Sequence, residues 1–176
     1  ELPGPSARSR GERESSTRRD GVPRGLASAR AEPVTGSPRV LVVGGRGFIG
    51  RHVVARARRE GWTVTSLSRR PVEAAAGTSA GAAVDPAVTE LTADLTDAEG
   101  LRAKLAAAPG GARFDYVVNG GGYIDHRPFS NGGRAVFAAH FDGVLNLLAA
   151  IERSAIRGFV NLGSSDEYGH APAPQY

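Results

Sequence analysis

The sequence contains no cysteine and only four histidines among its 176 residues. Without cysteine the chain cannot form a disulfide framework, a zinc-thiolate site or a cysteine nucleophile. We predict no metal site, because one would have to depend on the histidines and scattered carboxylates. No apolar run reaches the roughly 18 residues of a membrane-spanning helix. We therefore expect a protein with no membrane partner and a cytoplasmic location, with organelle targeting by the N-terminal segment left open.

Lysine is also scarce, since Lys104 is the one lysine among 22 basic residues and the other 21 are arginines. These 22 basic residues face 18 acidic ones. Divided at Pro38, the first part has seven arginines against five acids and the second has fifteen basic residues against thirteen acids, a net +2 in each. Neither part carries a strong field of one sign, and no aromatic residues alternate with the arginines. We predict no nucleic-acid partner.

Residues 1–38 are rich in Pro, Gly, Ser and Arg and show no helical or strand period. We expect them to form a disordered arm, followed by a folded domain at 39–176. Four of the five acids in this arm argue against a transit peptide, which is normally poor in acids: Glu12, Glu14, Asp20 and Glu32. The first residue is Glu rather than Met, which suggests a fragment.

Beyond residue 38, short β-branched runs alternate with helical patterns. Strands are predicted at 40–43, 62–67, 88–93, 114–118 and 158–162, helices at 48–60, 97–108 and 133–154, and an exposed loop at 71–86. The last helix is expected to bury one stripe made of Val136, Phe137, His140, Val144, Leu148 and Ile151, with His140 as a hydrogen-bonded core residue. Alternating elements of this kind predict an α/β fold with a doubly wound parallel sheet.

Three glycines spaced three apart, Gly44, Gly47 and Gly50, follow the first predicted strand and open the first helix. In this context Gly44 would permit a tight turn, Gly47 would let backbone amides approach a pyrophosphate, and Gly50 would let the helix pack closely. The start of the helix would then hold the negative charge. A P-loop is excluded because no Gly-Lys-Ser/Thr follows.

With Phe48 and Ile49 between its last two glycines, this loop resembles that of the extended short-chain dehydrogenase/reductase family, the nucleotide-sugar epimerases and dehydratases. The resemblance implies a Rossmann-like domain, C-terminally truncated here, that binds NAD or NADP through residues 44–50. Where the family has an acid for the ribose of NAD, this chain has Ser68, Arg69 and Arg70. Two guanidiniums suit the extra phosphate of NADP, although both arginines could simply be solvated.

Two further segments match the family. Asp94 and Leu95 stand where its members flank the adenine, although Asp94 could equally be a plain helix cap. Gly120, Gly121 and Gly122 stand where small residues let the backbone lie against the ribose and nicotinamide, and three consecutive glycines argue for a close approach. The segment from Gly143 to Leu148 resembles the family's long-helix signature, and similar enzymes form homodimers through this helix.

Only some of the catalytic residues of the family have counterparts in this sequence. The resemblance places the catalytic hydroxyl on Ser164, with Ser165 as the alternative, and Asp125, His126 and Arg127 are candidates for substrate contact. The family's Tyr-x-x-x-Lys pair is absent. We expect either the N-terminal part of an enzyme that transiently oxidises a nucleotide sugar at C4, inactive alone, or a non-catalytic dinucleotide-binding relative that acts as a sensor.

Overall fold

The computed structural model describes residues 36–71, 85–122, 129–131 and 133–163, which belong to one compact unit. Five strands form one sheet in the order β3-β2-β1-β4-β5, and every neighbouring pair is parallel. Their bounds are β1 Arg39–Val43, β2 Thr63–Ser68, β3 Val88–Thr92, β4 Tyr116–Asn119 and β5 Gly158–Asn161. The chain winds outward from β1 in both directions, so the predicted doubly wound parallel sheet is confirmed.

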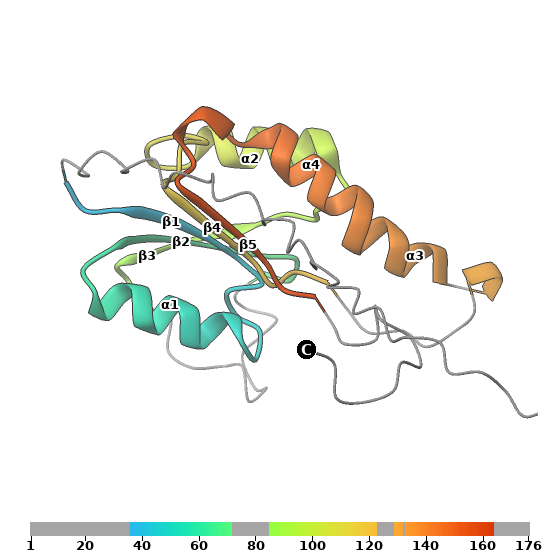
Figure 1. Ribbon diagram of the computed structural model, residues 1–176, viewed down its shortest axis with the longest axis horizontal. Coiled ribbons are helices and arrows are strands. Elements are labelled where there is room, and N and C mark those ends of the chain that lie inside the picture. The colour runs from blue at the N-terminus through green and yellow to red at the C-terminus, as the bar shows by residue number, and fades with distance from the viewer. Residues whose placement is uncertain (1–35, 72–84, 123–128, 132, 164–176) are drawn as a thin grey trace, which may run out of the picture. The chain divides into compact units, whose positions relative to one another are not determined.

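Helices cover both faces of this sheet (Figure 1). Helix α1, Gly50–Arg59, lies on one face, and α2, Ala98–Ala107, and α4, Gly143–Ala150, lie on the other. The side chains of β1 alternate between the two layers: Val40 and Val42 join the core under α1, whereas Leu41 and Val43 join the core under α2 and α4. A strand buried on both faces needs an uninterrupted apolar sequence, which is the pattern of residues 40–43.

Two helix starts test the sequence predictions. Helix α2 begins after Asp97, whose Oδ1 accepts a hydrogen bond from the backbone N–H of Gly100 at 3.0 Å, so the predicted acidic cap is confirmed. Helix α1 begins at Gly50 and not at Phe48, because residues 44–49 form the turn that leaves β1. The predicted loop at 71–86 lies mostly, and the arm at 1–38 almost entirely, outside the described residues.

The predicted single helix at 133–154 is wrong in detail. It is divided into α3, Gly133–Phe137, a π-helical segment η3, Ala138–Asp142, and α4, and short 3-10 helices lie at Phe129–Asn131 (η2) and Arg153–Ala155 (η4). A π-turn inserts a residue, which rotates the following positions by about 100° relative to an unbroken α-helix. The predicted stripe therefore splits: Phe137 and His140 are exposed, and α4 buries Gly143, Leu147 and Ala150.

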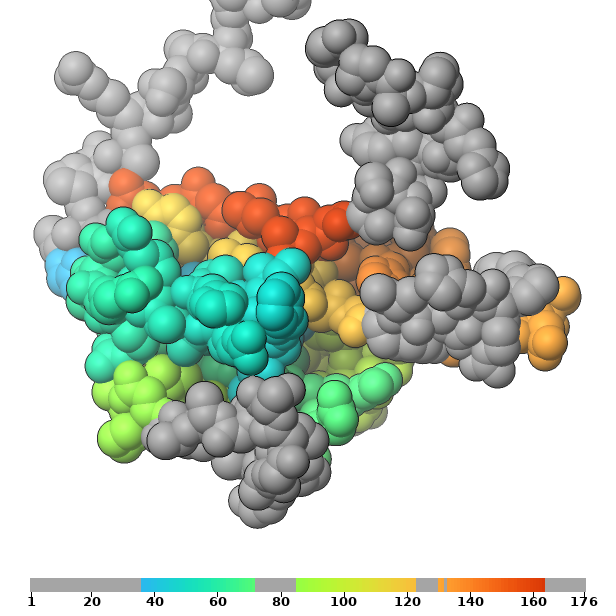
Figure 2. All heavy atoms as spheres, turned by 90° about the horizontal axis from the view of Figure 1, so that it is seen from below, coloured from blue at the N-terminus to red at the C-terminus, as the bar shows by residue number. Residues whose placement is uncertain are grey.

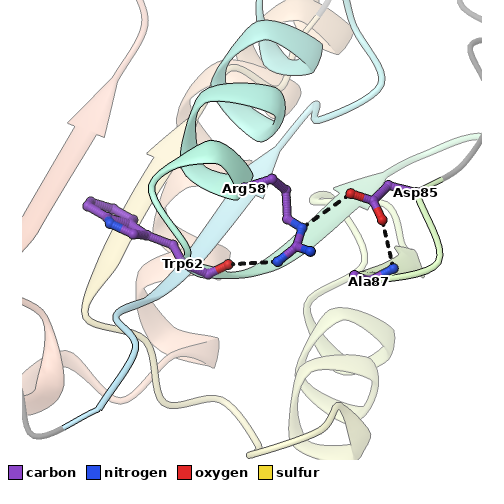
Figure 3. A network of polar contacts seen from close by, with 4 residues as sticks. All are labelled: Arg58, Trp62, Asp85 and Ala87. Carbon is purple, nitrogen blue, oxygen red and sulfur yellow. Dashed lines mark hydrogen bonds and ion pairs between the residues drawn. The ribbon is translucent and has the colours of Figure 1, made fainter.

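A polar network links the end of α1 to the segments that enter β2 and β3 (Figure 3). Arg58 of α1 donates from Nε to Oδ2 of Asp85 and from Nη1 to the carbonyl of Trp62, both at 3.2 Å. The other carboxylate oxygen of Asp85 accepts from the backbone N–H of Ala87 at 2.9 Å. This network joins the end of α1 to the segment that enters β3.

The α1 face of the sheet is only partly covered by that helix. Figure 2 looks onto this face. Helix α1 contacts β1 and β2, and Val160 of the edge strand β5 is 51% exposed. Among the helices that the structure describes, none is long and apolar enough to cross a membrane.

Candidate functional site

The strand order reverses at β1, so the loops that leave β1 and β4 diverge at the carboxyl ends of the strands. In parallel sheets this point is where a ligand crevice forms. A pocket lies there, enclosed by the loops after β1, β2, β3 and β4 and by the π-helical segment η3. It is lined by Val43, Gly44, Arg46, Gly47, Leu67, Ser68, Arg69, Arg70, Ala93, Asp94, Leu95, Gly120, Gly121, Gly122 and Ala139.

All but three of the predicted cofactor residues line this cleft. The exceptions are Phe48, Ile49 and Gly50. The side chains of Phe48 and Ile49 are 78% and 54% exposed and border an apolar groove on the α1 face of the sheet, with Trp62 and Tyr116 among its other residues. If residues 48–50 contact a ligand in the cleft, they must do so through their backbone.

The glycine-rich loop is built from close backbone contacts. Gly44 has a φ of +74°, and a Cβ there would lie 2.7 Å from the carbonyl oxygen of Gly120. A Cβ on Gly50 would overlap the carbonyl oxygen of Gly44. This geometry agrees with the turn role expected of Gly44 and the packing role expected of Gly50. Gly47 is different, because its N–H already donates to the Gly44 carbonyl at 2.8 Å.

The free donors of this loop include the amides at the start of α1. Arg51 donates to the carbonyl of Gly47 and His52 to that of Ile49. The amides of Phe48, Ile49 and Gly50 donate to no acceptor within the described residues, and the first turn of α1 has neither a side-chain cap nor an acid. Unpaired amides and the positive end of the helix dipole together form a site suited to an anion.

At the β2 and β3 ends of the cleft, Asp94 closes its own turn. Its Oδ1 accepts from the backbone N–H of Thr96 at 2.9 Å and from the Thr96 hydroxyl at 2.8 Å. These bonds, with the charge of Arg69, hold the pKa of Asp94 below its usual value despite partial burial. The helix-cap alternative for Asp94 is wrong, since Asp97 caps α2.

Leu95 is positioned in the cleft by helix α4. The side-chain amide of Asn146 donates to the carbonyl of Leu95 at 2.9 Å. A Cβ on Gly143 would lie 2.9 Å from the Cβ of Leu95. The segment from Gly143 to Asn146 therefore has a structural task, which is to hold the loop after β3 against α4.

Two of the three glycines after β4, Gly121 and Gly122, stand where a side chain would meet other parts of the protein. The N–H of Gly121 donates to Oδ1 of the buried Asn119 at 3.1 Å, and a Cβ on Gly121 would lie 2.8 Å from a methyl carbon of Val43. Gly122 has a φ of +143°, and a Cβ there would overlap the imidazole of His140. The prediction of a core position for His140 is wrong, because its side chain is exposed and lies against Gly122.

Some predicted residues lie outside the described part of the chain: Ser164, Ser165, Asp125, His126 and Arg127. Conversely, the structure adds Arg46 to the cleft, which sequence reasoning missed. The available signal was its place between Gly44 and Gly47, in a loop expected to face the ligand. Within the described ranges, no group of three or more His, Asp or Glu could hold a metal ion.

A curated protein is similar to this chain over most of the chain's length. A dTDP-6-deoxy-L-talose 4-dehydrogenase (NAD(P)(+)) from Kitasatospora kifunensis is 35% identical over 142 residues, which are 80% of this chain and 39% of the relative. The chain thus spans about two fifths of that protein.

Solved structures agree on the fold. A short-chain dehydrogenase/reductase superfamily protein from Agrobacterium tumefaciens, with bound NAD, is 27% identical with a TM-score of 0.55, covering 74% of this chain and 34% of that one. A UDP-galactose 4-epimerase is 24% identical with a TM-score of 0.58, covering 77% and 41%, and shows the fold alone.

The family model that matches the chain is that of the NAD dependent epimerase/dehydratase family, over residues 40–176. The match covers the sheet, the glycine-rich loop and the cleft. The resemblance drawn from the sequence, to the extended short-chain dehydrogenase/reductases, is confirmed, as is the cofactor class of NAD or NADP. The chain belongs to the NAD dependent epimerase/dehydratase family.

Proposed function

We propose that the cleft binds NAD or NADP, with the diphosphate on the amides of Phe48, Ile49 and Gly50. The observation that supports this most directly is that these amides have no partner within the described residues and stand at the start of α1, beside a cleft without side chains at Gly44 and Gly47. A dianionic group fits there because the amides supply hydrogen bonds and the helix supplies positive potential.

The rest of the cleft suits the two ends of a dinucleotide. Ser68, Arg69 and Asp94 offer polar groups to the adenosine ribose, and Leu95 offers an apolar surface to the adenine. The loop of Gly120, Gly121 and Gly122, on the far side of the glycine-rich turn, offers backbone without side chains to the nicotinamide end. Flat ligand groups can approach backbone closely only where no Cβ intervenes.

We further propose that the substrate is a nucleotide-activated sugar, oxidised at C4 in transit to an epimerised or dehydrated product. The bound dinucleotide would supply the hydride acceptor and return the hydride. The curated relative is named a 4-dehydrogenase of a dTDP-sugar, which supports oxidation at that position. Ser164 or Ser165 would hydrogen-bond the sugar oxygen, since both follow β5 in the chain, and the N–H of Leu162 just before them bonds the carbonyl of Asn119 at the cleft edge.

Calorimetric titration of the 176-residue chain with NAD and with NADP tests the binding proposal. We expect binding of at least one of them, and a loss of at least about tenfold in affinity for Gly47→Asp, which places a carboxylate beside the proposed diphosphate site. The matched control is Ala103→Asp, which adds the same charge to the exposed face of α2 and should bind as the unmodified chain does. Equal affinities in all three chains would contradict the placement.

The reaction is tested separately with a nucleotide sugar that carries deuterium at C4. Transfer of deuterium to the bound cofactor, measured by mass spectrometry, would support oxidation at C4. The measurement uses the full-length protein, because the 176-residue chain lacks the Tyr-x-x-x-Lys pair and is expected to be inactive alone. Full-length protein that binds the dinucleotide but accepts no deuterium would support the non-catalytic alternative.

A further inference from the structure

A buried ion pair lies beside the cleft and has no role in the proposed function. Arg46 stands in the glycine-rich loop and lines the cleft. Its Nε lies 3.8 Å from Oε2 of Glu90, in the middle of β3. The two side chains are only 14% and 18% exposed, so this pair is largely removed from solvent.

The pair is poorly satisfied where it lies. Among the described residues, none of the three guanidinium nitrogens of Arg46 makes a hydrogen bond, and neither does Oε2 of Glu90. A separation of 3.8 Å is too long for one. Burying two charges costs free energy that is recovered only when further hydrogen bonds complete the pair. Arg46 therefore keeps its donors available for a better acceptor than Glu90.

The surroundings of Glu90 offer no such completion. Glu90 is opposite Ser66 in the β2–β3 register, and the Ser66 hydroxyl is fully buried and also without a hydrogen-bond partner in the described structure. A Cβ on Gly45 would overlap that hydroxyl, so the loop closes over the β2 side of this polar cluster. Arg46 also lines the cleft, so a ligand there could offer its guanidinium an acceptor other than Glu90.

The same corner of the cleft contains the residues proposed to meet the adenosine ribose. The backbone N–H of Arg46 lies 3.5 Å from the hydroxyl oxygen of Ser68, and Arg69 and Arg70 follow at the end of β2. NADP differs from NAD by one phosphate on this ribose. A phosphate presents several acceptor oxygens to the planar guanidinium, whereas Glu90 presents one oxygen at 3.8 Å.

We propose that Glu90 sets the choice between the two cofactors by holding Arg46 away from that phosphate. This inference rests on the proposed dinucleotide site and adds a residue that does not line it. Glu90 acts as a positioning residue: its carboxylate competes with the phosphate for the Arg46 guanidinium and repels the phosphate charge. NAD carries no such phosphate, so its binding does not require Arg46 to leave Glu90.

The test measures the affinities of NAD and NADP for the unmodified chain, Glu90→Gln, Arg46→Ala and the double variant. Glu90→Gln should raise the ratio of NADP to NAD affinity about tenfold, mainly through tighter NADP binding. Arg46→Ala should lower that ratio. Compared with Arg46→Ala alone, the double variant should change the ratio by less than about threefold, because Arg46, for which Glu90 and the phosphate compete, is absent from both chains.

The matched control is Glu99→Gln, the same substitution at an exposed acid of α2, which should leave the ratio unchanged. Urea unfolding of each variant identifies any chain that has lost its fold. If Glu90→Gln does not fold, Glu90→Asp, which keeps the charge on a shorter side chain, replaces it. It should raise the ratio less than tenfold but measurably. A ratio within about twofold of the unmodified chain in folded Glu90 variants that still bind NAD would overturn this inference and leave the proposed function intact. Failure of the unmodified chain to bind either dinucleotide would instead overturn the proposed function.

Discussion

The side-chain amide of Asn119 donates to Oδ1 of Asn161 at 2.7 Å and so links the carboxyl ends of β4 and β5. The carbonyl oxygen of the same side chain accepts from the backbone N–H of Gly121. Asn119 is 3% exposed, so its side chain is shielded from water, whereas Asn161 is exposed. One buried amide thus fixes the strand pair and the glycine loop that lines the cleft.

Replacing Asn119 with Leu, which has a similar size and no polar atoms, should destabilise the fold by roughly 1–3 kcal/mol, because the Gly121 N–H loses its acceptor. Urea unfolding measures this change. Asn161→Ala serves as the comparison, since it removes one of the two bonds at an exposed residue and should cost less. Equal losses would mean that the bond to Gly121 contributes nothing.

Gly50→Ala should also destabilise the protein, by roughly 1–3 kcal/mol. The added methyl group meets the backbone carbonyl of Gly44, which cannot rotate away as a side chain could, so α1 must shift along β1. Because α1 carries the amides proposed to bind the diphosphate, dinucleotide affinity should fall as well. Thermal unfolding and calorimetry on one preparation check both effects; an unchanged melting temperature would contradict the close packing.

Arg69→Ala should weaken NADP binding by about tenfold and NAD binding by less than about twofold, since a guanidinium bonds the extra phosphate of NADP. Arg69 already acts on the cleft electrostatically, as its charge helps to lower the pKa of Asp94. Titrations with both cofactors measure the difference, and Arg102→Ala on the exposed face of α2 is the control. Equal losses for the two cofactors would show that Arg69 does not distinguish them.

Acid should weaken the network at the end of α1. The backbone N–H of Ala87 and the guanidinium of Arg58 lower the pKa of Asp85 in the folded state. A lowered folded-state pKa stabilises the protein fully above the unfolded-state value, about 3.9, and this contribution disappears as the pH falls below it toward the folded-state pKa. Urea unfolding at about pH 6 and at about pH 3, on either side of that value, measures this contribution. The unfolding free energy should fall less for Asp85→Asn than for the unmodified chain when the pH is lowered.

The sheet and most of the cleft could be predicted from the sequence because their signals are local. Residues 40–43 are apolar without interruption, as a strand buried on both faces must be. The glycine spacing reflects two backbone contacts, at Gly44 and Gly50, that no other residue permits. Since parallel strands end at one edge, residues that follow each predicted strand meet in one place.

The features that the sequence did not predict depend on contacts between distant segments. In the π-helical segment His140 packs against Gly122, and directly after it Gly143 packs against Leu95. A helical period read along one segment gives no information about either contact. The pairing of Arg46 with Glu90 depends on how β3 aligns with β2, through a connection of mixed Ala, Gly and Ser that has no pattern.

Trp62 is the only tryptophan in the sequence, and its ring stacks on that of Tyr116 with 4.8 Å between the ring centroids. The pair lies near the amino ends of the strands, whereas the cleft lies at their carboxyl ends. The fluorescence of Trp62 will therefore follow the loss of tertiary structure with little direct quenching by a nucleotide bound at the opposite edge. A single optical signal can monitor folding in every variant above while calorimetry reports occupancy, so instability and impaired ligand recognition can be told apart in the same sample.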